Sequence, residues 1–292
     1  MKRSKKGGGR GTKNFTPKEG RVFVAFWGRD GYNSRKEGKI LGRTGRKTME
    51  FAANEGKNVT IQAMGKTWAR HAIHTHFVEV GESYIDLMER YVKPVYQPGD
   101  ILSMSEKVIA MCQKRVVQED EVKPGFWAKV LSRCVHQTSA GPGMGLPVKM
   151  QFAINHCGLP KVLWAAFRSA VDKLRGVHGT FYNILGQEVS GLDGFYGNDI
   201  PEYAHMGVRI PEDPAGVCDE IYEKTGITAM IVDANDLTVE MLGHCGKLTQ
   251  TDQELLELIA DNPAGQDRQL TPFILIREVK EEQAPAAEEA KE

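Results

Sequence analysis

Apolar residues along the chain follow two patterns: short uninterrupted runs, and longer stretches in which they recur at helical spacing. Uninterrupted runs fit a strand that is covered on both faces, whereas recurrence every three or four residues fits a helix with one buried face. The first pattern predicts strands at 21–27, 181–185, 229–232 and 271–277. The second predicts helices at 82–93, 127–134 and 251–259, and residues 161–175 are predicted to be a strand that passes into a helix.

Capping residues give two of the predicted helices defined ends. Asp213 is suited to cap a helix whose first turn holds Pro214 and whose end is marked by Gly226. This helix leads directly into the apolar run 229–232. Thr251 and Glu254 have the spacing of a capping box at the start of the next helix.

The run 229–232 ends abruptly in polar residues, with Asp233, Asn235 and Asp236 in quick succession. Carboxylates are costly to desolvate unless a cation or hydrogen-bond donors receive them, so these residues are candidates for a metal or ribose site. A local role fits the pattern equally well, because Asp233 or Asn235 can cap the turn that follows.

A second polar feature interrupts the apolar segment 101–111, which follows the turn at 98–100. Lys107 stands in the middle of this segment, and Arg115 follows shortly after it. A cation that emerges from a buried strand needs an anion. The partner is either a structural carboxylate, Glu106 or Glu79, or a bound phosphate.

A third group of acids lies in the glycine-flanked segment 190–199, where Asp193 is exposed on a predicted loop. Loops held by rigid elements commonly carry ligand-binding residues. His71, His74 and His76 form the densest group of histidines, but no cysteine or acid stands at a usual zinc-ligand spacing. We therefore favour surface or substrate-facing histidines over a zinc site.

Composition narrows the function classes. The chain has 292 residues, 41% of them hydrophobic and 26% charged, and a net charge of zero, which argues against coating nucleic acid or an acidic membrane as its main role. Residues 1–20 are basic and residues 279–292 are acidic, and both are predicted to be disordered tails. The longest apolar run is too short to span a membrane, and no signal peptide is visible. Together with five scattered cysteines, these features predict a reduced, cytoplasmic protein.

The ordered series of motifs resembles the coenzyme F(420)-0:gamma-glutamyl ligases, which use GTP to add glutamate to a deazaflavin coenzyme precursor. The resemblance runs from Thr75 to Arg277. Its strongest parts are the segment 99–115, the Asp193-Gly194 loop, the strand end at Asp233, and Gly265-Gln266 before the last strand. It is closest to the divergent bacterial branch, in which the strand end reads Asp-Ala-Asn-Asp-Leu.

The resemblance implies roles for individual residues. Asp193 and Asp233, with Asp236 and Gln266, would hold Mg²⁺ or Mn²⁺ on the nucleotide phosphates. The positions that would contact GTP are Thr75, His76, Lys107, Arg115, Asn235, Gly265 and Gln266. Three departures stand out: Ala234 replaces a metal-binding hydroxyl, Lys114 replaces a glycine, and Tyr196 stands where an asparagine is usual.

The resemblance also implies an α+β fold with a mixed sheet, a two-lobed subunit and a homodimer. On this basis residues 75–278 are the catalytic domain, and residues 21–74 are an N-terminal extension of unknown role. We expect a GTP- and metal-dependent ligase that joins a carboxylate acceptor to glutamate. A non-catalytic nucleotide sensor is the alternative. A Rossmann dehydrogenase is disfavoured, because no strand runs into a full glycine fingerprint.

Overall fold

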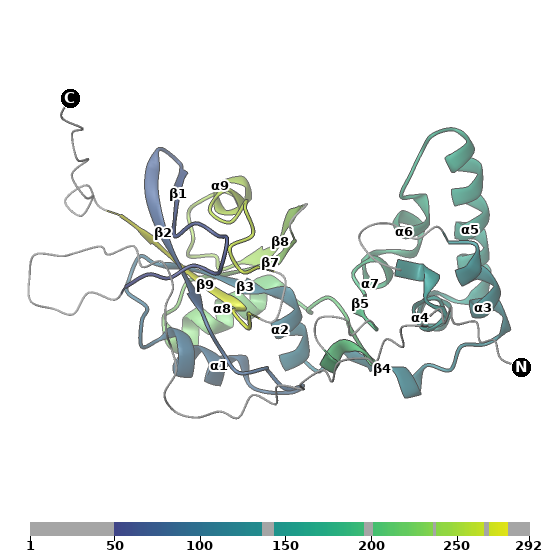
Figure 1. Cartoon of the computed structure of the whole chain (residues 1–292), viewed down its shortest axis with the longest axis horizontal. Helices are drawn as coiled ribbons and strands as arrows, with labels where there is room; N and C mark the ends of the chain where they lie inside the picture. The colour runs from purple at the N-terminus through teal and green to yellow at the C-terminus, as the bar shows by residue number, and fades with distance from the viewer. Residues whose placement is uncertain (1–49, 136–142, 196–200, 236–237, 266–268, 280–292) are drawn as a thin grey trace, which may run out of the picture. The chain divides into compact units, whose positions relative to one another are not determined.

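The computed structural model describes residues 50–135, 143–195, 201–235, 238–265 and 269–279, and these residues form a mixed α+β fold (Figure 1). The larger sheet has six strands in the order β1-β2-β9-β3-β7-β8. Its strands are β1 (Thr60–Ala63), β2 (Lys66–Ile73), β3 (Ile101–Ser105), β7 (Ala229–Ala234), β8 (Val239–His244) and β9 (Phe273–Glu278). The β3–β7 pair is parallel, and every other neighbouring pair is antiparallel.

Helices cover both faces of this sheet. They are α1 (Tyr84–Leu87), which continues as a π-helical turn over Met88–Val92, α2 (Glu106–Cys112), α8 (Pro214–Thr225) and α9 (Asp252–Glu257). Alternate residues of β7 point to opposite faces. Ile231 packs in one core with Val217 and Ile221 of α8. Met230 and Val232 pack in the other core, which also contains Leu255 of α9.

A smaller, three-stranded sheet has the order β4-β6-β5. Its strands are β4 (Val116–Gln118), β5 (Asp193–Gly194) and β6 (Met206–Val208), and both pairs are antiparallel. Between β4 and β5 the chain forms α3 (Phe126–Arg133), α4 (Pro147–Cys157), α5 (Leu159–Leu174), α6 (Thr180–Leu185) and α7 (Gln187–Ser190). Residues from α3 to α7 share a separate core, which includes Ala128, Ala153, Val162, Leu185 and Val189.

Most of the predicted elements that fall in the described residues are confirmed. The strands at 229–232 and 271–277 correspond to β7 and β9, and the helices at 82–93, 127–134 and 251–259 are present. Asp213 accepts a hydrogen bond from the N–H of Gly216, and Thr251 and Glu254 form the predicted capping box. The predicted strand at 21–27 and both predicted tails lie outside the described residues, apart from Val279.

Three strand predictions were wrong in whole or in part. The segment 101–111, expected to be a buried strand around Lys107, is a strand only as far as Ser105, because α2 begins at Glu106. Residues 161–175 contain no strand, because α5 begins at Leu159 with Pro160 in its first turn, where a missing N–H costs nothing. Residues 181–185 belong to α6, which is bounded by two glycines with positive φ, Gly179 and Gly186. Phe181, Tyr182 and Ile184 pack on the core of the helical segment, so tertiary contacts override the strand preference of this aromatic run.

The N-terminal part of the described chain belongs to the larger sheet. β2 pairs along its length with β9, from Trp68 opposite Glu278 to Ile73 opposite Phe273. Residues 60–73, which precede the region of resemblance, are therefore part of the same sheet as the last strand. Among the described residues, no helix has the length and apolar character needed to cross a membrane.

Candidate functional site

The parallel pair β3–β7 brings two of the predicted site residues to one edge of the larger sheet. Ser105, the last residue of β3, lies beside Val232 of β7. Lys107 follows in the first turn of α2, and Asp233 is the next residue of β7. Ligands in sheets with parallel strands commonly bind beyond the carboxyl ends of those strands, so this edge is a plausible place for a site.

Lys107 forms an ion pair that the sequence did not reveal. Its Nζ lies 2.9 Å from Oδ2 of Asp193 and 3.9 Å from Oε1 of Glu106. Of the two carboxylates expected as structural partners, Glu106 pairs with Lys107, at the longer distance. Lys107 lies in the first turn of α2, which follows β3, and Asp193 comes from the smaller sheet. The pair therefore joins two elements that are far apart in the sequence.

The carboxylates around Lys107 influence one another's titration. Burial raises the pKa of Glu106 to about 7, and the charges of Asp233, Asp193 and Glu240 act in the same direction while Lys107 opposes them. Burial alone would lower the pKa of Lys107, but the charges of Asp193, Glu106 and Asp233 outweigh it and raise that pKa above its usual value. Lys107 therefore lies among carboxylates that stabilise its charged form.

The smaller sheet positions Asp193, which lies half-buried in β5 and not exposed on a loop as the sequence predicted. Asp193 pairs with Val208 and Gly194 pairs with Gly207 across β5 and β6. The N–H of Gly194 donates to Oδ1 of Asp193 at 2.8 Å, which leaves Oδ2 for Lys107. Gly194 has a φ of +93°, and a Cβ at this position would lie 2.2 Å from the carbonyl oxygen of Met206. Only glycine fits here, so the backbone places the Asp193 carboxylate.

A second lysine lies close to this group and was missed by the sequence analysis. Lys149 of α4 is only 3% exposed, and its Nζ donates to the carbonyl oxygen of Leu192 at 3.1 Å. Burial lowers its pKa, Lys107 acts in the same direction and Asp193 opposes them. A lysine within the apolar helical segment 147–154 was the signal that could have identified it.

Asp233 and Asn235 have different local surroundings. Asp233 is half-buried and lies opposite Glu240 in the β7–β8 pair. Asn235 closes the turn between these strands: its Oδ1 accepts from the N–H of Thr238, and its N–H donates to the Thr238 carbonyl, both at 2.9 Å. The local, turn-capping role thus applies to Asn235. Asp236 lies outside the described residues.

Thr75 and His76 are held by contacts near the end of β2. Thr75 is buried, and its N–H donates to the carbonyl oxygen of Leu270 at 2.8 Å. Nδ1 of His76 lies 2.6 Å from the Tyr91 hydroxyl, and its Nε2 lies 2.9 Å from both carboxylate oxygens of Glu82. His76 is therefore oriented by two side chains of the α1 region.

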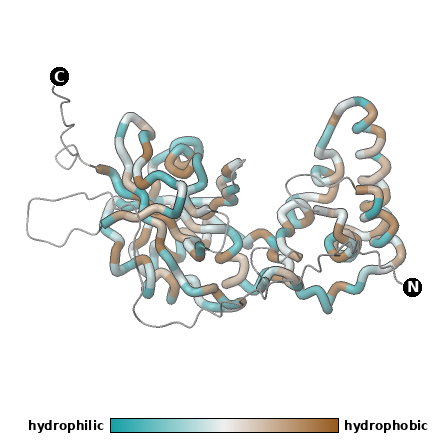
Figure 2. Tube along the Cα trace, viewed as in Figure 1, coloured by the Kyte–Doolittle hydropathy of each residue, from teal (hydrophilic) through white to brown (hydrophobic). Residues whose placement is uncertain are grey.

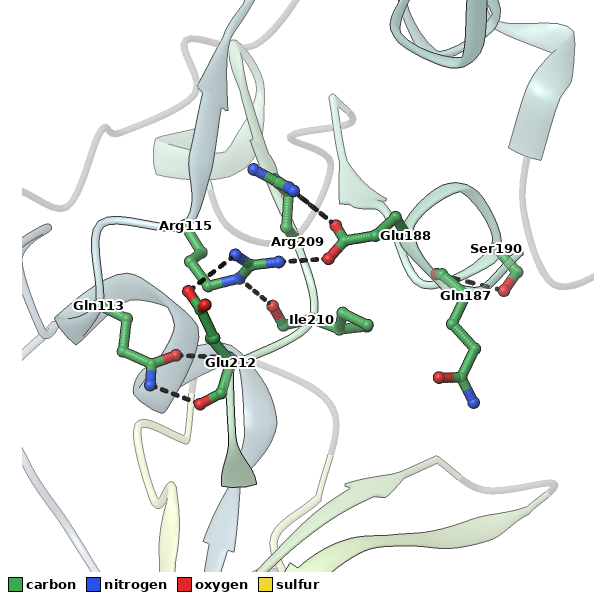
Figure 3. Close-up of polar contacts among 8 residues, drawn as sticks. All are labelled: Gln113, Arg115, Gln187, Glu188, Ser190, Arg209, Ile210 and Glu212. Atoms are coloured by element: carbon green, nitrogen blue, oxygen red, sulfur yellow. Dashed lines mark hydrogen bonds and ion pairs between the residues drawn. The ribbon is translucent and has the colours of Figure 1, made fainter. Parts of the chain in front are cut away.

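Arg115 lies in a separate polar cluster, which Figure 3 shows. Its Nε donates to the carbonyl oxygen of Ile210 at 2.6 Å, and its guanidinium pairs with Glu188 and Glu212. Glu188 also binds Arg209, with Nη2 at 2.8 Å. Val208 of β6 pairs with Val116 of β4 on one side and with Asp193 of β5 on the other. Arg115 directly precedes Val116 and Arg209 directly follows Val208, so both arginines lie next to the residues that flank Asp193 in the sheet.

Lys114 and Gly265 both have backbones in the left-handed region. Lys114 has a φ of +59°, at the position where the resembled family has glycine, and Gly265 has a φ of +72°. The N–H of Gly265 donates to the Asn262 carbonyl oxygen at 3.2 Å, as part of a turn before β9. Gln266, the adjacent predicted ligand, lies outside the described residues.

Carboxylate oxygens are the ligands that Mg²⁺ and Mn²⁺ prefer, so Asp193 and Asp233 fit such an ion in chemical type and in charge. Within the described ranges, however, no three His, Cys, Asp or Glu side chains converge closely enough to form a metal centre. Lys107 is the cation that contacts Asp193 in this arrangement.

A scan against models of known protein families and a search of curated proteins both gave no match to this chain.

Proposed function

We propose that this protein is a GTP- and divalent-metal-dependent ligase that forms an amide bond between a carboxylate acceptor and glutamate, as the gamma-glutamyl ligases do. The observation that carries the proposal is the Lys107–Asp193 ion pair, with the charge of Asp233 acting on the same lysine. All three residues were selected from the sequence as phosphate or metal ligands, and they come from three separate elements.

A further observation supports the resemblance itself. Lys114 occupies a position where the family has glycine, and its backbone φ of +59° lies in the region that favours glycine. The local backbone conformation thus suits the family's usual residue although the residue has changed. The same resemblance supports the proposal of a two-lobed subunit that forms a homodimer.

The proposed chemistry requires an activated acid, because amide formation from a free carboxylate is uphill in water. The acceptor carboxylate attacks the terminal phosphorus of GTP, and GDP leaves. The glutamate amine then attacks the carbonyl carbon of the acyl phosphate, so that phosphate leaves and the nitrogen loses a proton. A divalent ion would neutralise charge between the phosphate oxygens.

The chain's own residues would serve distinct tasks in this scheme. Asp193 and Asp233 would hold the metal, with Asp236 and Gln266 as further candidate ligands. Lys107 would exchange its contact with Asp193 for one with a phosphate oxygen once a metal occupies the carboxylate. Thr75, His76 and Gly265 remain candidate nucleotide contacts through the resemblance. Asn235 and Arg115 are weaker candidates, because a turn and two carboxylates already engage them.

A non-catalytic nucleotide sensor is the second candidate function. Ala234 cannot supply the hydroxyl that the family uses at the metal, and Arg115 is already held by Glu188 and Glu212. Loss of the hydroxyl at the metal would affect turnover more than binding. Such a protein would bind GTP and metal without forming an amide bond.

Two measurements separate these functions. Calorimetry of GTP binding, with and without Mg²⁺ or Mn²⁺, tests the nucleotide site, and the absence of metal-dependent binding would contradict both candidates. Phosphate release is then measured with GTP, metal, glutamate and a panel of carboxylic acids, including a deazaflavin coenzyme precursor. Release that requires both glutamate and one acid identifies a ligase, whereas binding without release identifies a sensor.

A further inference from the structure

Positive charge is concentrated in the segment 123–185, which contains α3, α4, α5 and α6. This segment has eight Lys or Arg residues and a single acid, Asp172, although the whole chain has a net charge of zero. Lys149 is buried and Arg168 is half-buried, while the other six cations are exposed: Lys123, Lys129, Arg133, Lys161, Lys173 and Arg175. A charge balance over the whole chain therefore conceals a strongly basic helical segment.

The same segment exposes large apolar side chains. On α5, Trp164 is 56% exposed, Phe167 61% and Leu174 90%. Phe126 and Trp127 are also exposed at the start of α3. Large apolar side chains that gather on a surface usually mark a binding site.

The outer face of α5 combines rings and cations. Lys161, Trp164, Phe167 and Arg168 follow one another at intervals of three, three and one residues, which places them on one side of α5, and Arg175 is the residue that caps its C-terminal end. We call these five residues the basic aromatic face. The rings of Trp164 and Phe167 are in contact, with centroids 5.9 Å apart.

The side of α5 that adjoins this face packs on the protein's own core, which contains Val162 and Ala165. Figure 2 shows hydrophobic and hydrophilic residues alternating along α5. The basic aromatic face is thus the side that is left for a partner. The only acid within α5, all of which the structure describes, is Asp172, which is buried and pairs with Arg168 at 2.9 Å.

The positive charge of the basic aromatic face favours some classes of partner over others. A second copy of α5 would bring cations against cations, which disfavours self-pairing. A helix that lies on a membrane separates its apolar side from its cationic side, whereas here rings and cations share one side. Single-stranded nucleic acid offers phosphates for the cations and unpaired bases that stack on aromatic rings.

We propose that the basic aromatic face binds single-stranded nucleic acid, with bases stacking on Trp164 and Phe167 and phosphates contacting Lys161 and Arg175. This interaction is independent of the proposed ligase site. Stacking on aromatic rings tolerates any base, so binding should show little sequence preference. A duplex should bind more weakly than a single strand of the same length, because its bases are already stacked and paired.

Fluorescence anisotropy with the full chain and a labelled oligouridylate of about 20 nucleotides, longer than a typical single-domain footprint, tests the stacking part. Trp164→Leu keeps an apolar side chain but removes the ring. We expect it to weaken binding roughly tenfold, as for loss of one stacked base. The residue is exposed, so circular dichroism should show an unchanged fold. Equal affinity of the two proteins would overturn the proposal.

The electrostatic part is tested by the double change Lys161→Gln and Arg175→Gln. Loss of two phosphate contacts should reduce the slope of log affinity against log salt by about 1.4. The double change Lys93→Gln and Lys224→Gln is the matched control, because both residues are exposed and lie outside the segment 123–185. All variants keep the basic N-terminal residues, so any binding by those residues cancels in the comparison. A slope that changes equally in the control would contradict the proposal.

Two other outcomes would replace the proposal. If the protein ignores oligouridylate but binds phosphatidylserine vesicles, and the double change Lys161→Gln and Arg175→Gln weakens that binding, the face is a membrane surface. If light scattering shows a dimer that Trp164→Leu dissociates, without any oligouridylate binding, the face is a contact between copies of this chain.

Discussion

Asp233 lies opposite Glu240 in the β7–β8 pair, so two carboxylates occupy directly opposed positions. Like charges in such positions destabilise a sheet by a few tenths of a kcal/mol to about 1 kcal/mol. A carboxylate at position 233, where it destabilises the β7–β8 pair, is accounted for if Asp233 binds a ligand. The consequence of removing that charge can be predicted separately for binding and for stability.

Asp233→Asn keeps the shape of the side chain and removes its charge. Metal-dependent GTP binding should weaken by at least about tenfold, since even indirect partners of a metal contribute that much. Stability to urea should stay constant or rise, because the repulsion from Glu240 is lost. Calorimetry and urea unfolding measure the two effects.

Glu240→Gln is the matched control for this change, since it removes the same repulsion and leaves Asp233 in place. It should raise stability similarly and preserve most of the metal-dependent affinity. If Asp233→Asn binds GTP and metal as tightly as the native protein, Asp233 is not a metal ligand and the proposed function loses one of its three residues.

At the scale of an element, Gly194 determines how β5 joins β6 and where Asp193 lies. Gly194→Ala combines a positive φ with a contact of 2.2 Å to the Met206 carbonyl oxygen. We expect a loss of stability of about 2 kcal/mol or more, together with weaker metal-dependent GTP binding as Asp193 moves. Urea unfolding and calorimetry give the two values.

Gly56→Ala distinguishes the effect of backbone strain from the effect of steric clash in the Gly194→Ala experiment. Gly56 also has a positive φ, of +78°, but nothing lies within 4 Å of the added Cβ. It should lower stability by only about 1 kcal/mol and leave GTP binding unchanged. Equal effects of the two substitutions would show that close packing against β6 does not position Asp193.

The α7 element contributes Glu188, which joins Arg115 to Arg209 (Figure 3). Glu188→Gln removes the charge that two partly buried guanidinium groups share. Stability should fall by about 2 kcal/mol, the scale of a hydrogen bond to a charged group. GTP affinity should change less than twofold if Arg115 serves the structure.

Glu212→Gln is the control for Glu188→Gln, because Glu212 pairs with the same arginine but its side chain is 77% exposed. An exposed ion pair contributes about 0 to 1 kcal/mol, so little stability should be lost. A marked gain in GTP affinity in Glu188→Gln would instead show that Arg115 is a phosphate ligand that Glu188 restrains.

At the scale of the whole molecule, Arg70 of β2 joins segments from both ends of the described chain. Arg70 is 1% exposed; its Nη2 donates to Oδ2 of Asp261 at 2.8 Å and to the Asn58 carbonyl oxygen at 2.8 Å. The hydrogen bond from Arg70 lowers the pKa of Asp261, with burial opposing it. The charge of the buried Arg70 guanidinium is therefore balanced by the Asp261 carboxylate.

Asp261→Asn should lower the free energy of unfolding by about 2 kcal/mol at pH 7. Removal of one partner of a buried pair costs about 3 to 5 kcal/mol, and the value is reduced here because the Asp261 side chain is 37% exposed. A carboxyl with a lowered folded pKa stabilises above its unfolded pKa, near 4, and loses this effect as pH falls through the folded value. The difference between the two proteins should therefore shrink below about pH 4.

Urea unfolding at a series of pH values tests this prediction, with Asp120→Asn as the control at an exposed aspartate. The control should match the native protein throughout. A difference that stays constant down to pH 2 would show that the substitution acts through packing and not through the charge of Asp261.

The sequence by itself determined the elements whose signals are local. The caps at Asp213 and Thr251 depend on side chains that bond within three residues, and the apolar runs of β7 and β9 are covered on both faces. Such signals are complete within about a dozen residues. These local signals also identified Asp233, because a polar residue that directly follows an apolar run can be recognised from the sequence alone.

Only the tertiary structure decided which distant residues meet. Asp193 became the partner of Lys107 because the β5–β6 pairing and the N–H of Gly194 orient its carboxylate. Residues 181–185 became helical because their rings pack on a shared core of helices, which no local pattern specifies. The parallel β3–β7 pair set the register between Lys107 and Asp233. These outcomes depend on contacts between remote segments, whose geometry the local preferences of the chain do not encode.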